Sequence, residues 1–563
     1  MINYLDFKDA RCRDCYKCLR ECPVKAICVS DRHAKIIEKR CILCGRCTKI
    51  CPQNAKIVHS ERQTAEKLLK TANVVASVAP SFAASFGIKD FTVMKIALGK
   101  LGFFDAQETA VGARAVTSEY KRLLEGKKFK NFITSACPAV NYMIQMYYPK
   151  ALPYLAPVDS PMIAHAKIIK GERDDVKVVF IGPCIAKKKE AAENGIIDCV
   201  LTFEDIRAMF NERNIVLEDI ARVSIGLRTE GCGNAKYYPI SRGIIKSFDE
   251  CPSGYEYVAV DGNAKCCEVL DNIESLSGMF LELSCCEYSC VNGPCALEIK
   301  GGAVKANGNI REYVAMEGLK ERVKTGASVV NLERVYRRLH ADGSAPSERD
   351  LREILEKTGK KTKDDELNCG ACGYNTCREK AWAVFNGYAA TEMCLPYMRE
   401  RAESMSYEII QNSPNGIILL DEEFKITEIN NKAVEMLGTD GRFELKGRAV
   451  FEFLDPTDFV VAANEGVNIY NKKMYIDKTE KYAELTVVIL KSQKLLFGVM
   501  KDITDETQSA NRLNALKLET LTTTDGVIKK QMRVAQEIAS LLGETTAETK
   551  LALLKLKRTI SEN

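Results

Sequence analysis

The chain has 563 residues, 46% of them hydrophobic and 28% charged, with a formal net charge of +5. Such a composition is ordinary for a globular protein of about three to five domains, and so small a net charge excludes a basic stripe of the kind that binds nucleic acid. The N-terminal residues lack the charged lead and apolar core of a secretory signal, and the most apolar stretch, residues 74–88, is broken by Pro80 and falls short of the ~20 apolar residues that a membrane span needs. We therefore expect a cytoplasmic protein that interacts with neither nucleic acid nor membrane.

Cysteine is the residue type whose use departs most from the ordinary. The chain contains 24 cysteines, the last at Cys394, but 4 histidines. In a chain expected to be cytoplasmic, this number favours metal thiolates over disulfides. With so few imidazoles, zinc sites of mixed Cys/His type are disfavoured, and iron–sulfur clusters are the expected cofactors.

Residues 1–60 contain the motif CxxCxxCxxxCP twice, at an interval of 29 residues. Three thiolates two residues apart can hold three corners of a cubane, and the proline after the fourth cysteine directs that thiolate to the other cluster. The spacing predicts two 4Fe-4S clusters, one held by Cys12, Cys15, Cys18 and Cys51 and the other by Cys22, Cys41, Cys44 and Cys47. Eight structural or zinc-binding cysteines are the alternative. The segment resembles a two-cluster bacterial ferredoxin, which is an electron-transfer module.

The region 72–325 alternates short apolar stretches with helical ones, which predicts α/β layering. We expect strands at residues 73–80, 130–137, 176–184, 198–202 and 257–262, with helices around 97–103 and 203–213. Residues 326–365, rich in Arg, Lys and Glu, are expected to form a solvated helical linker.

Four further cysteines are dispersed through this α/β region, at Cys137, Cys184, Cys286 and Cys290. Two of them close an expected strand, where layered α/β folds build their binding sites, so the four could converge on one site. A buried cysteine at a strand end is more often a small apolar side chain, and that alternative stays open for each one taken alone.

Taken together, the segments TSACPAV, GPCIAKKKE and ELSCCEYSC resemble the signature segments of FeFe hydrogenases, whose common forms are TSCCPxW, MPCxxKxxE and ExMxCxxGC. The resemblance covers roughly residues 72–300 and keeps all four cysteines, together with Lys187, Glu190 and Glu282. It implies an H-cluster, in which the four cysteines hold a 4Fe-4S cubane and Cys290 bridges to a two-iron centre carrying CO, cyanide and a dithiolate.

The same resemblance assigns the surroundings of that centre. It implies that Lys187 faces one iron-bound cyanide in a charge-assisted contact, and that Pro80 and Ser81 lie near the other. Such a site interconverts H2 with protons and electrons, the cofactor supplying the chemistry and the protein its orientation and electrostatics.

Several positions depart from the pattern of an active enzyme. The relay thiol of the CC pair is replaced by Ala136, and a relay serine in a later segment falls at Ala156. The other departures are Gly182 and Ser284 in place of two methionines beside the two-iron centre, Met162 in place of a pocket glutamine, and Val140 in place of the TSCCPxW aromatic. Because a proton relay needs titratable groups within hydrogen-bond reach of each other, we expect low hydrogenase activity.

A third cysteine set lies in residues 350–404, where Cys369, Cys372, Cys377 and Cys394 follow the spacing CxxCx4C...C. The set resembles the four-cysteine 4Fe-4S domain of several anaerobic redox proteins, and glycines between the cysteines let the backbone pass close to a cubane. A zinc knuckle is the alternative. The eight remaining cysteines, Cys285 among them, receive no predicted role.

The last part of the chain changes in character, with no cysteine or histidine after Cys394. Residues 405–508 resemble a PAS domain, opening on the NSPNG turn and closing on LLFGVMKDITDE. Residues 509–563 carry apolar side chains at helical spacing, among them Leu513, Leu516 and Val527. Gly543 is expected to end the first helix, and Thr545 with Glu548 to form a capping box for the second. We expect a helical dimerisation or output tail, packing within the chain being the alternative.

These features lead to the hypothesis of a sensory, H2-sensing and PAS-containing FeFe hydrogenase of low activity. We expect it to act on H2 and protons, to exchange electrons with a ferredoxin-type partner, to form a homodimer, and to signal to a separate phosphatase or kinase. Two other classes stay open. One is a non-catalytic hydrogenase-like protein of iron–sulfur cluster assembly, and the other is a ferredoxin-linked electron-transfer component.

Overall fold

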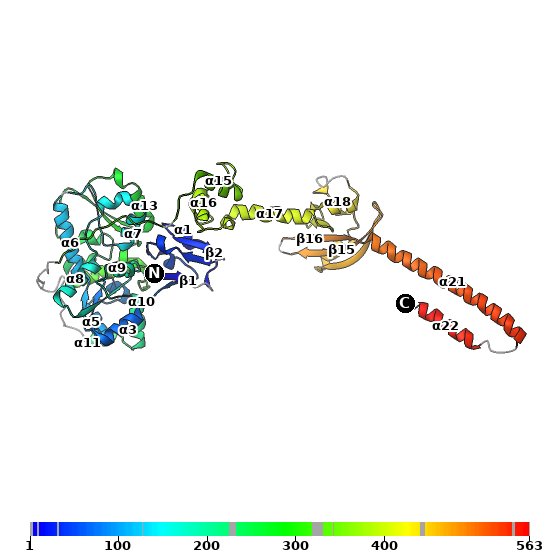
Figure 1. Cartoon of the computed structure of the whole chain (residues 1–563), viewed down its shortest axis with the longest axis horizontal. Coiled ribbons are helices and arrows are strands. Elements are labelled where there is room, and N and C mark those ends of the chain that lie inside the picture. Colours follow the sequence, from blue (N-terminus) through cyan, green and yellow to red (C-terminus); the bar gives the residue numbers. More distant parts are fainter. Residues whose placement is uncertain are drawn as a thin grey trace. The chain divides into compact units, whose positions relative to one another are not determined.

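The computed structural model describes residues 4–561, apart from 8–10, 31–32, 127, 224–231, 318–329, 342, 440–444, 492 and 543–546. The chain divides into two compact units, Met1–Tyr397 and Met398–Asn563, whose elements are labelled in Figure 1. Among the helices of the described residues, none combines the length and the apolar character needed to cross a membrane.

Unit 1 opens with a small module of two antiparallel strand pairs around two short helices. Strand β1 (Leu5–Phe7) pairs with β4 (Lys56–Val58), and β2 (Ile27–Ser30) with β3 (His33–Ile36); the helices are α1 (Lys17–Arg20) and α2 (Arg46–Lys49). Gly45, just before α2, has a φ of +70°, and a Cβ placed there would lie 2.3 Å from the Cβ of Pro294. Only glycine lets this module approach the following domain so closely.

The second part of unit 1 contains two parallel sheets. One has the strand order β6-β5-β8-β9 and the other the order β10-β11-β7. The strands are β5 (Asn73–Val78), β6 (Asp105–Glu108), β7 (Phe132–Ile133), β8 (Val176–Gly182), β9 (Cys199–Thr202), β10 (Glu256–Asp261) and β11 (Met279–Ser284). The predicted α/β architecture is confirmed. Strands β6 and β11 are not predicted by the sequence pattern, because β6 has few apolar residues and Glu282 interrupts the apolar run of β11.

Helices cover both faces of the first sheet. Val74 and Ala76 of β5 belong to one apolar cluster, whereas Val75 belongs to another on the opposite face. Burial on both faces is why the parallel strands read as nearly continuous apolar runs. The helices of this domain are α3 (Arg62–Thr71), α4 (Phe82–Phe86), α5 (Phe91–Leu101), α6 (Ala110–Glu125), α7 (Pro138–Tyr147), α8 (Pro161–Glu172), α9 (Ala186–Asn194), α10 (Phe203–Glu212), α11 (Leu217–Val223), α12 (Gly243–Ser247), α13 (Asn263–Asp271) and α14 (Gly302–Glu317).

The segment after α14 corrects one prediction. Residues 326–365 do not form a solvated helical linker in their described part: residues 330–341 contain no helix and lie against the α/β domain, and helix appears only at α15 (Glu348–Lys357). The amide of Asp159 donates to the carbonyl of Leu332 at 2.8 Å, and the amide of Leu339 to that of Gln145 at 2.9 Å. We call residues 330–341 the strap. Its charged composition is typical of a solvated helix, but backbone hydrogen bonds and buried Leu332 hold it against the α/β domain.

The last part of unit 1 is a small domain built from α15 and α16 (Cys377–Phe385). It rests on the N-terminal module: Arg20 donates to the carbonyl of Ala371 at 3.2 Å and Lys25 to that of Gly373 at 2.9 Å. Gly373 has a φ of +94°, and a Cβ there would lie 2.9 Å from the side chain of Leu19. The two cysteine-rich modules are therefore in direct contact.

Unit 2 contains an antiparallel sheet with the order β13-β12-β16-β15-β14. Its strands are β12 (Gly416–Leu420), β13 (Ile426–Ile429), β14 (Ile469–Ile476), β15 (Lys481–Leu490) and β16 (Leu495–Asp502), with helices α18 (Asn431–Leu437) and α20 (Thr457–Glu465). Helix α17 (Leu395–Gln411) leads into this domain, and buried Asn430 ties its end to the sheet by donating to the carbonyls of Ile410 and Asn415, both at 2.9 Å.

The chain ends in two helices, α21 (Thr504–Leu542) and α22 (Ala547–Ser561), linked by an ion pair of 2.7 Å between Lys557 and Asp525. Figure 1 shows α22, in red, running back beside α21. The apolar side chains of Leu513, Leu516 and Val527 are exposed in the single chain. The predicted helix end at Gly543 and the cap at Thr545 lie outside the described residues.

Candidate functional site

The four dispersed cysteines come from the ends of strands in both parallel sheets. Cys137 follows β7 and directly precedes α7, whereas Cys184 lies between β8 and α9. Cys286 follows β11, and Cys290 lies in the turn Ser289–Asn292. Carboxyl ends of parallel strands leave open backbone and space for a site, and here two sheets supply them.

The four thiols lie close enough to change one another's pKa. Burial raises the pKa of Cys286 most, followed by the charges of Cys290, Cys184 and Cys137. The pKa of Cys184 rises to about 11, first through burial and then through Cys137. Four converging sulfur donors are what a 4Fe-4S cubane requires, so these residues fit the group that the sequence predicts for them.

Cys285 is a neighbour of this set that the sequence does not single out. A hydrogen bond from Cys285 lowers the pKa of Cys137 to about 6, outweighing the effect of burial, and the same bond raises the pKa of Cys285. In the sequence, the only indication that Cys285 belongs near the site is that it directly precedes Cys286. Adjacency by itself does not predict a role.

Lys187 occupies the centre of a buried polar network. Its ammonium is 2.7 Å from Oε2 of Glu190, 2.9 Å from Oγ of Ser160 and 3.4 Å from the carbonyl of Ala136. Oγ of Ser160 donates in turn to Glu190 at 3.0 Å. Lys187 and Glu190 face the same side because they are three residues apart on α9. Lys187 also acts electrostatically on Cys137, Cys184 and Cys290, so the structure brings it to the cysteine site.

Arg334 on the strap completes this network and is missed by sequence reasoning. Its guanidinium donates to Oε1 of Glu190 at 3.0 Å, from 144 positions away along the chain. Glu190 is 1% exposed, so it receives two cations in a place with little solvent screening. One carboxylate between two cations leaves the network with a net positive charge. Arg334 lies in a charged segment, and nothing there distinguishes it from its exposed neighbours.

The predicted residues around the centre are apolar or small. Ala136 packs in the same apolar cluster as Ala156, so both predicted relay positions lie in an apolar environment. The hydroxyl of Ser81 is buried without a hydrogen-bond partner in the described residues, and Pro80 precedes it at the end of β5. A Cβ on Gly182 would come within 2.8 Å of the Phe180 ring.

Ser284 and Glu282 lie on β11, next to the site. Oγ of Ser284 is 3.2 Å from Oγ of Ser289. The carboxyl of Glu282 accepts hydrogen bonds of 3.0 Å from the amides of Gly243 and Ile245, at the start of α12. Burial, the largest effect, raises the pKa of Glu282 to about 8 despite these donors. The environment of Glu282 therefore favours its protonated form, on the same strand that carries Ser284.

The N-terminal cysteines gather in two groups with the crossed composition that the repeat predicts. One cavity is lined by Cys12, Cys15, Cys18 and Cys51. In the other group, burial and then the charges of Cys44, Cys41 and Cys22 raise the pKa of Cys47. Cys22 thus lies with the second motif's cysteines. Each group presents four sulfur donors, and both fit a 4Fe-4S cluster.

A single cavity connects the second group to the dispersed cysteines. It is lined by Cys22 and Cys44 of the N-terminal module and by Cys285 and Cys286 of the α/β domain. Asn263 donates to the Cys44 sulfur at 3.4 Å from the α/β side. Sulfur atoms of the N-terminal module and sulfur atoms of the candidate site therefore line the same cavity.

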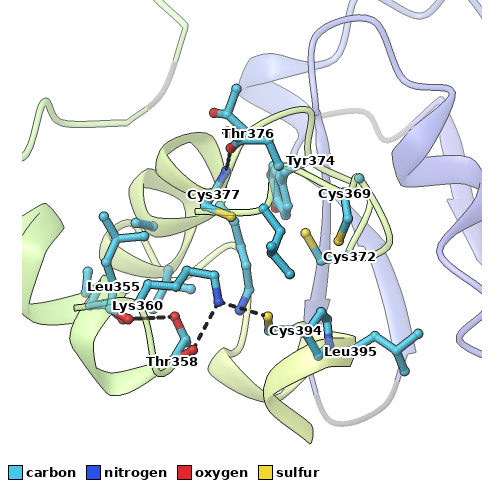
Figure 2. A pocket seen from close by; sticks show the side chains of 18 residues that line it. Leu355, Thr358, Lys360, Cys369, Cys372, Tyr374, Thr376, Cys377, Cys394 and Leu395 are labelled. Carbon is cyan, nitrogen blue, oxygen red and sulfur yellow. Dashed lines mark hydrogen bonds between the residues drawn. The ribbon is translucent and has the colours of Figure 1, made fainter. Parts of the chain in front are cut away.

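The last cysteine set also surrounds one cavity. Figure 2 shows the sulfur atoms of Cys369, Cys372, Cys377 and Cys394 directed toward it. Four converging thiols without a histidine fit a 4Fe-4S cluster rather than a mixed Cys/His zinc site. Lys360 and Lys380 also line this cavity, and neither is singled out by the sequence.

Comparison with protein families accounts for most of the chain. The model described as "Iron only hydrogenase large subunit, C-terminal domain" matches residues 72–254, and a 4Fe-4S binding domain matches residues 34–57. A model of an Fe-S cluster domain matches residues 365–396, and a PAS domain model matches residues 404–469.

Two curated proteins are similar in sequence to this chain. The periplasmic [Fe] hydrogenase large subunit of Nitratidesulfovibrio vulgaris is 29% identical over 299 residues, covering 46% of this chain and 69% of the relative. The cytosolic Fe-S cluster assembly factor NAR1 of Eremothecium gossypii is 26% identical over 167 residues, covering 27% and 37%.

Among solved structures, a variant FeFe hydrogenase of Chlamydomonas reinhardtii matches with 15% identity and a TM-score of 0.38, over 50% of this chain and all of that one. A PAS domain of an HTR-like protein from Haloarcula marismortui matches with 22% identity and a TM-score of 0.16, over 18% and 99%. The family models and the curated hydrogenase relative show that the chain is similar to FeFe hydrogenases over its α/β part, and that it also matches iron–sulfur and PAS domain models.

Proposed function

We propose that the chain is a sensory FeFe hydrogenase, in which Cys137, Cys184, Cys286 and Cys290 hold an H-cluster. When bound, this group supplies the interconversion of H2 with two protons and two electrons. The observation that carries the proposal is the Lys187 network: a buried ammonium, held by Glu190 and Ser160, lies beside four converging thiols. A fixed cation of this kind suits the cyanide ligands of the two-iron centre.

The side chains at the two predicted relay positions favour slow interconversion of H2 and protons. Ala136 accepts a hydrogen bond from Lys187 through its carbonyl, but its methyl side chain has no proton to transfer. Ala156 offers none either, and the two alanines belong to one apolar cluster. Since proton transfer requires titratable groups in hydrogen-bond contact, protons leave or reach this site slowly.

We propose that electrons pass between the candidate site and the cysteine groups of unit 1. Cys44 and Cys286 line one cavity, and the small four-cysteine domain rests on α1. From there, the redox status of the clusters would reach the PAS domain, the helical tail and a signalling phosphatase or kinase. The exposed Leu513 and Leu516 of α21 suit a homodimer contact.

Infrared spectroscopy of the matured protein under H2, argon and CO tests the proposal. We expect CO and cyanide bands that respond to H2, together with low turnover. The variant Ala136→Cys adds a thiol to the residue whose carbonyl accepts from Lys187 and should raise turnover, whereas Ala115→Cys, a thiol elsewhere in the same apolar cluster, should not. Turnover equal to that of prototypical enzymes, or the absence of these bands, contradicts the proposal.

A second candidate is a non-catalytic protein of iron–sulfur cluster assembly. The similarity to the assembly factor of Eremothecium gossypii supports it. Such a protein would hold a cubane at the four cysteines without the two-iron centre, and would have no use for a buried lysine pointed at that centre. Cluster signals without CO and cyanide bands would favour this candidate.

A further inference from the structure

The four-cysteine cavity of unit 1 carries two lysine side chains whose role no comparison assigns. Lys360 is 9% exposed and Lys380 is 5% exposed. Lysine is almost never buried without a compensating group, because removing an ammonium from water is costly. Both residues line the cavity that Cys369, Cys372, Cys377 and Cys394 surround.

The partners of the two ammonium groups are carbonyls and sulfur. Lys360 donates to the Cys394 sulfur at 3.4 Å and to the carbonyl of Thr358 at 3.0 Å (Figure 2). Lys380 donates to the carbonyl of Thr391 at 2.8 Å. In the described part of the chain, the charges that favour the Lys380 cation are those of the cysteine thiolates, and they oppose the larger effect of burial. The thiolates are thus the negative charge that these lysines face.

The lysines near the other cysteine groups are more open to solvent. Lys25 and Lys56, which act on Cys22 and Cys18, are only partly buried. Partial exposure screens their charge, whereas a buried charge acts at a lower effective dielectric. Lys360 and Lys380 are therefore screened less by solvent than Lys25 and Lys56.

We propose that Lys360 and Lys380 raise the reduction potential of the 4Fe-4S cluster held by the small domain, so that this cluster collects electrons from the N-terminal module. Reduction adds one electron to a cluster that four thiolates already make negative, and the donor cluster loses that electron. Nearby cations stabilise the more negative, reduced form more than the oxidised form. Net charge and hydrogen bonds to sulfur are among the factors that set cluster potentials.

The small domain lies between the N-terminal module and helix α17, so an electron held on its cluster can influence the next part of the chain. Leu19 of α1, between Cys18 and Cys22, contacts Gly373, so the two modules are close enough to exchange electrons. Cys394 is followed directly by Leu395, the first residue of α17. Whether this cluster is reduced thus changes the charge at the start of the helix that enters unit 2. The inference does not require H2 chemistry, since electrons from any donor would collect at the same place.

A redox titration of the full chain, reconstituted with iron and sulfide and followed by electron paramagnetic resonance, tests the inference. The signal of this cluster is identified as the one lost in Cys372→Ser. We expect it to be reduced before the two clusters of the N-terminal module. In the double variant Lys360→Met/Lys380→Met, its equilibrium constant for reduction should fall at least tenfold, which is about 59 mV for one electron.

Two controls separate charge from folding. Lys361→Met removes one positive charge from an exposed neighbouring position and should leave the reduction potential unchanged. Lys380→Arg keeps the charge and should retain most of the native potential. The inference is overturned if the native cluster is not the first of these three to be reduced, a result that depends on no lysine variant. An unchanged potential in the double variant with full iron content, or an equal shift in Lys361→Met, overturns it as well.

Discussion

The protein buries lysine beside cysteine in two places and balances the charge in different ways. At the hydrogenase-like site, the Lys187 ammonium lies 2.7 Å from Glu190, which also binds Arg334. In the four-cysteine domain, Lys360 and Lys380 contact carbonyls and a sulfur atom instead of a carboxylate. At the hydrogenase-like site, a carboxylate holds the lysine cation in a fixed position. In the four-cysteine domain, the described hydrogen-bond partners of the two lysines include no carboxylate, so their charge acts on the group that the thiolates bind.

We therefore expect the lysine paired with a carboxylate to contribute mainly to the stability of the fold. The two lysines beside the four cysteines should contribute mainly to the electrostatic potential at those cysteines. A buried ion pair is costly to break, because the remaining partner stays charged and away from water. A lysine bonded to carbonyls and a sulfur atom leaves no buried carboxylate unpaired when it is removed, and its loss should cost less. Mutations at the two places should therefore differ in what they disturb.

The largest expected effect is that of Lys187→Met. It leaves the Glu190 carboxylate, 1% exposed, with Arg334 as its only charged partner in the described network. We expect the free energy of unfolding of the α/β domain to fall by about 3 kcal/mol, measured by hydrogen exchange of the α9 and β8 amides. Adding Glu190→Gln should recover part of this loss. Lys170→Met, which removes a more exposed partner of Asp198, should cost under about 1 kcal/mol. Equal effects of Lys187→Met and Lys170→Met would refute the idea that Lys187 is structurally distinct.

Arg334→Met should have the next largest effect. It removes the ion pair between the strap and Glu190, and the free energy of unfolding should fall by about 2 kcal/mol because Lys187 still compensates the carboxylate. Release of the strap should appear as faster proteolysis and faster exchange of the Asp159 and Leu339 amides. Arg337→Met, on an exposed side chain of the same strap, is the matched control. If it releases the strap equally, the contact with Glu190 is not what holds it.

Lys360→Met should have a smaller effect on stability, about 1 kcal/mol, because it leaves only the Thr358 carbonyl and a sulfur atom without their donor. Its thermal midpoint, followed by the fluorescence of Trp382 in α16, should change little while the cluster potential shifts. Trp382 is the single tryptophan of the chain. A stability loss as large as that of Lys187→Met would remove the contrast between the two places.

A pH dependence carried by Glu282 should, over one pH unit, be about as large as the effect of Lys360→Met. Burial raises its folded-state pKa to about 8, above the ordinary carboxyl value. The fold therefore favours the protonated form, and its stabilising contribution is complete below the unfolded pKa and is lost as the pH rises toward about 8. We expect the α/β domain to lose about 1 kcal/mol between pH 6 and pH 7. Glu282→Gln should abolish this slope in urea denaturation, and an unchanged slope would assign it to another group.

How much the sequence predicts differs from one region to the next. The cysteine repeat predicts its crossed grouping because cubane ligands follow a short local spacing, and the structure places Cys22 with Cys44 and Cys47 accordingly. Strands buried on both faces are predicted from their apolar runs. The strap is predicted wrongly because charged residues are typical of solvated helices, and its backbone partners, such as Gln145, lie nearly 200 positions away.

The sequence by itself determined the order of the modules and the spacing of the cysteine sets, and it predicts Ala136 at a relay position, since each of these depends on local spacing or on a single residue. Only the tertiary structure decided how buried charge is compensated. Arg334 reaches Glu190 across 144 positions, and Lys360 reaches Cys394 across 34. Charge compensation acts through space over a few ångström, so no local pattern distinguishes these cations from the exposed lysines and arginines around them.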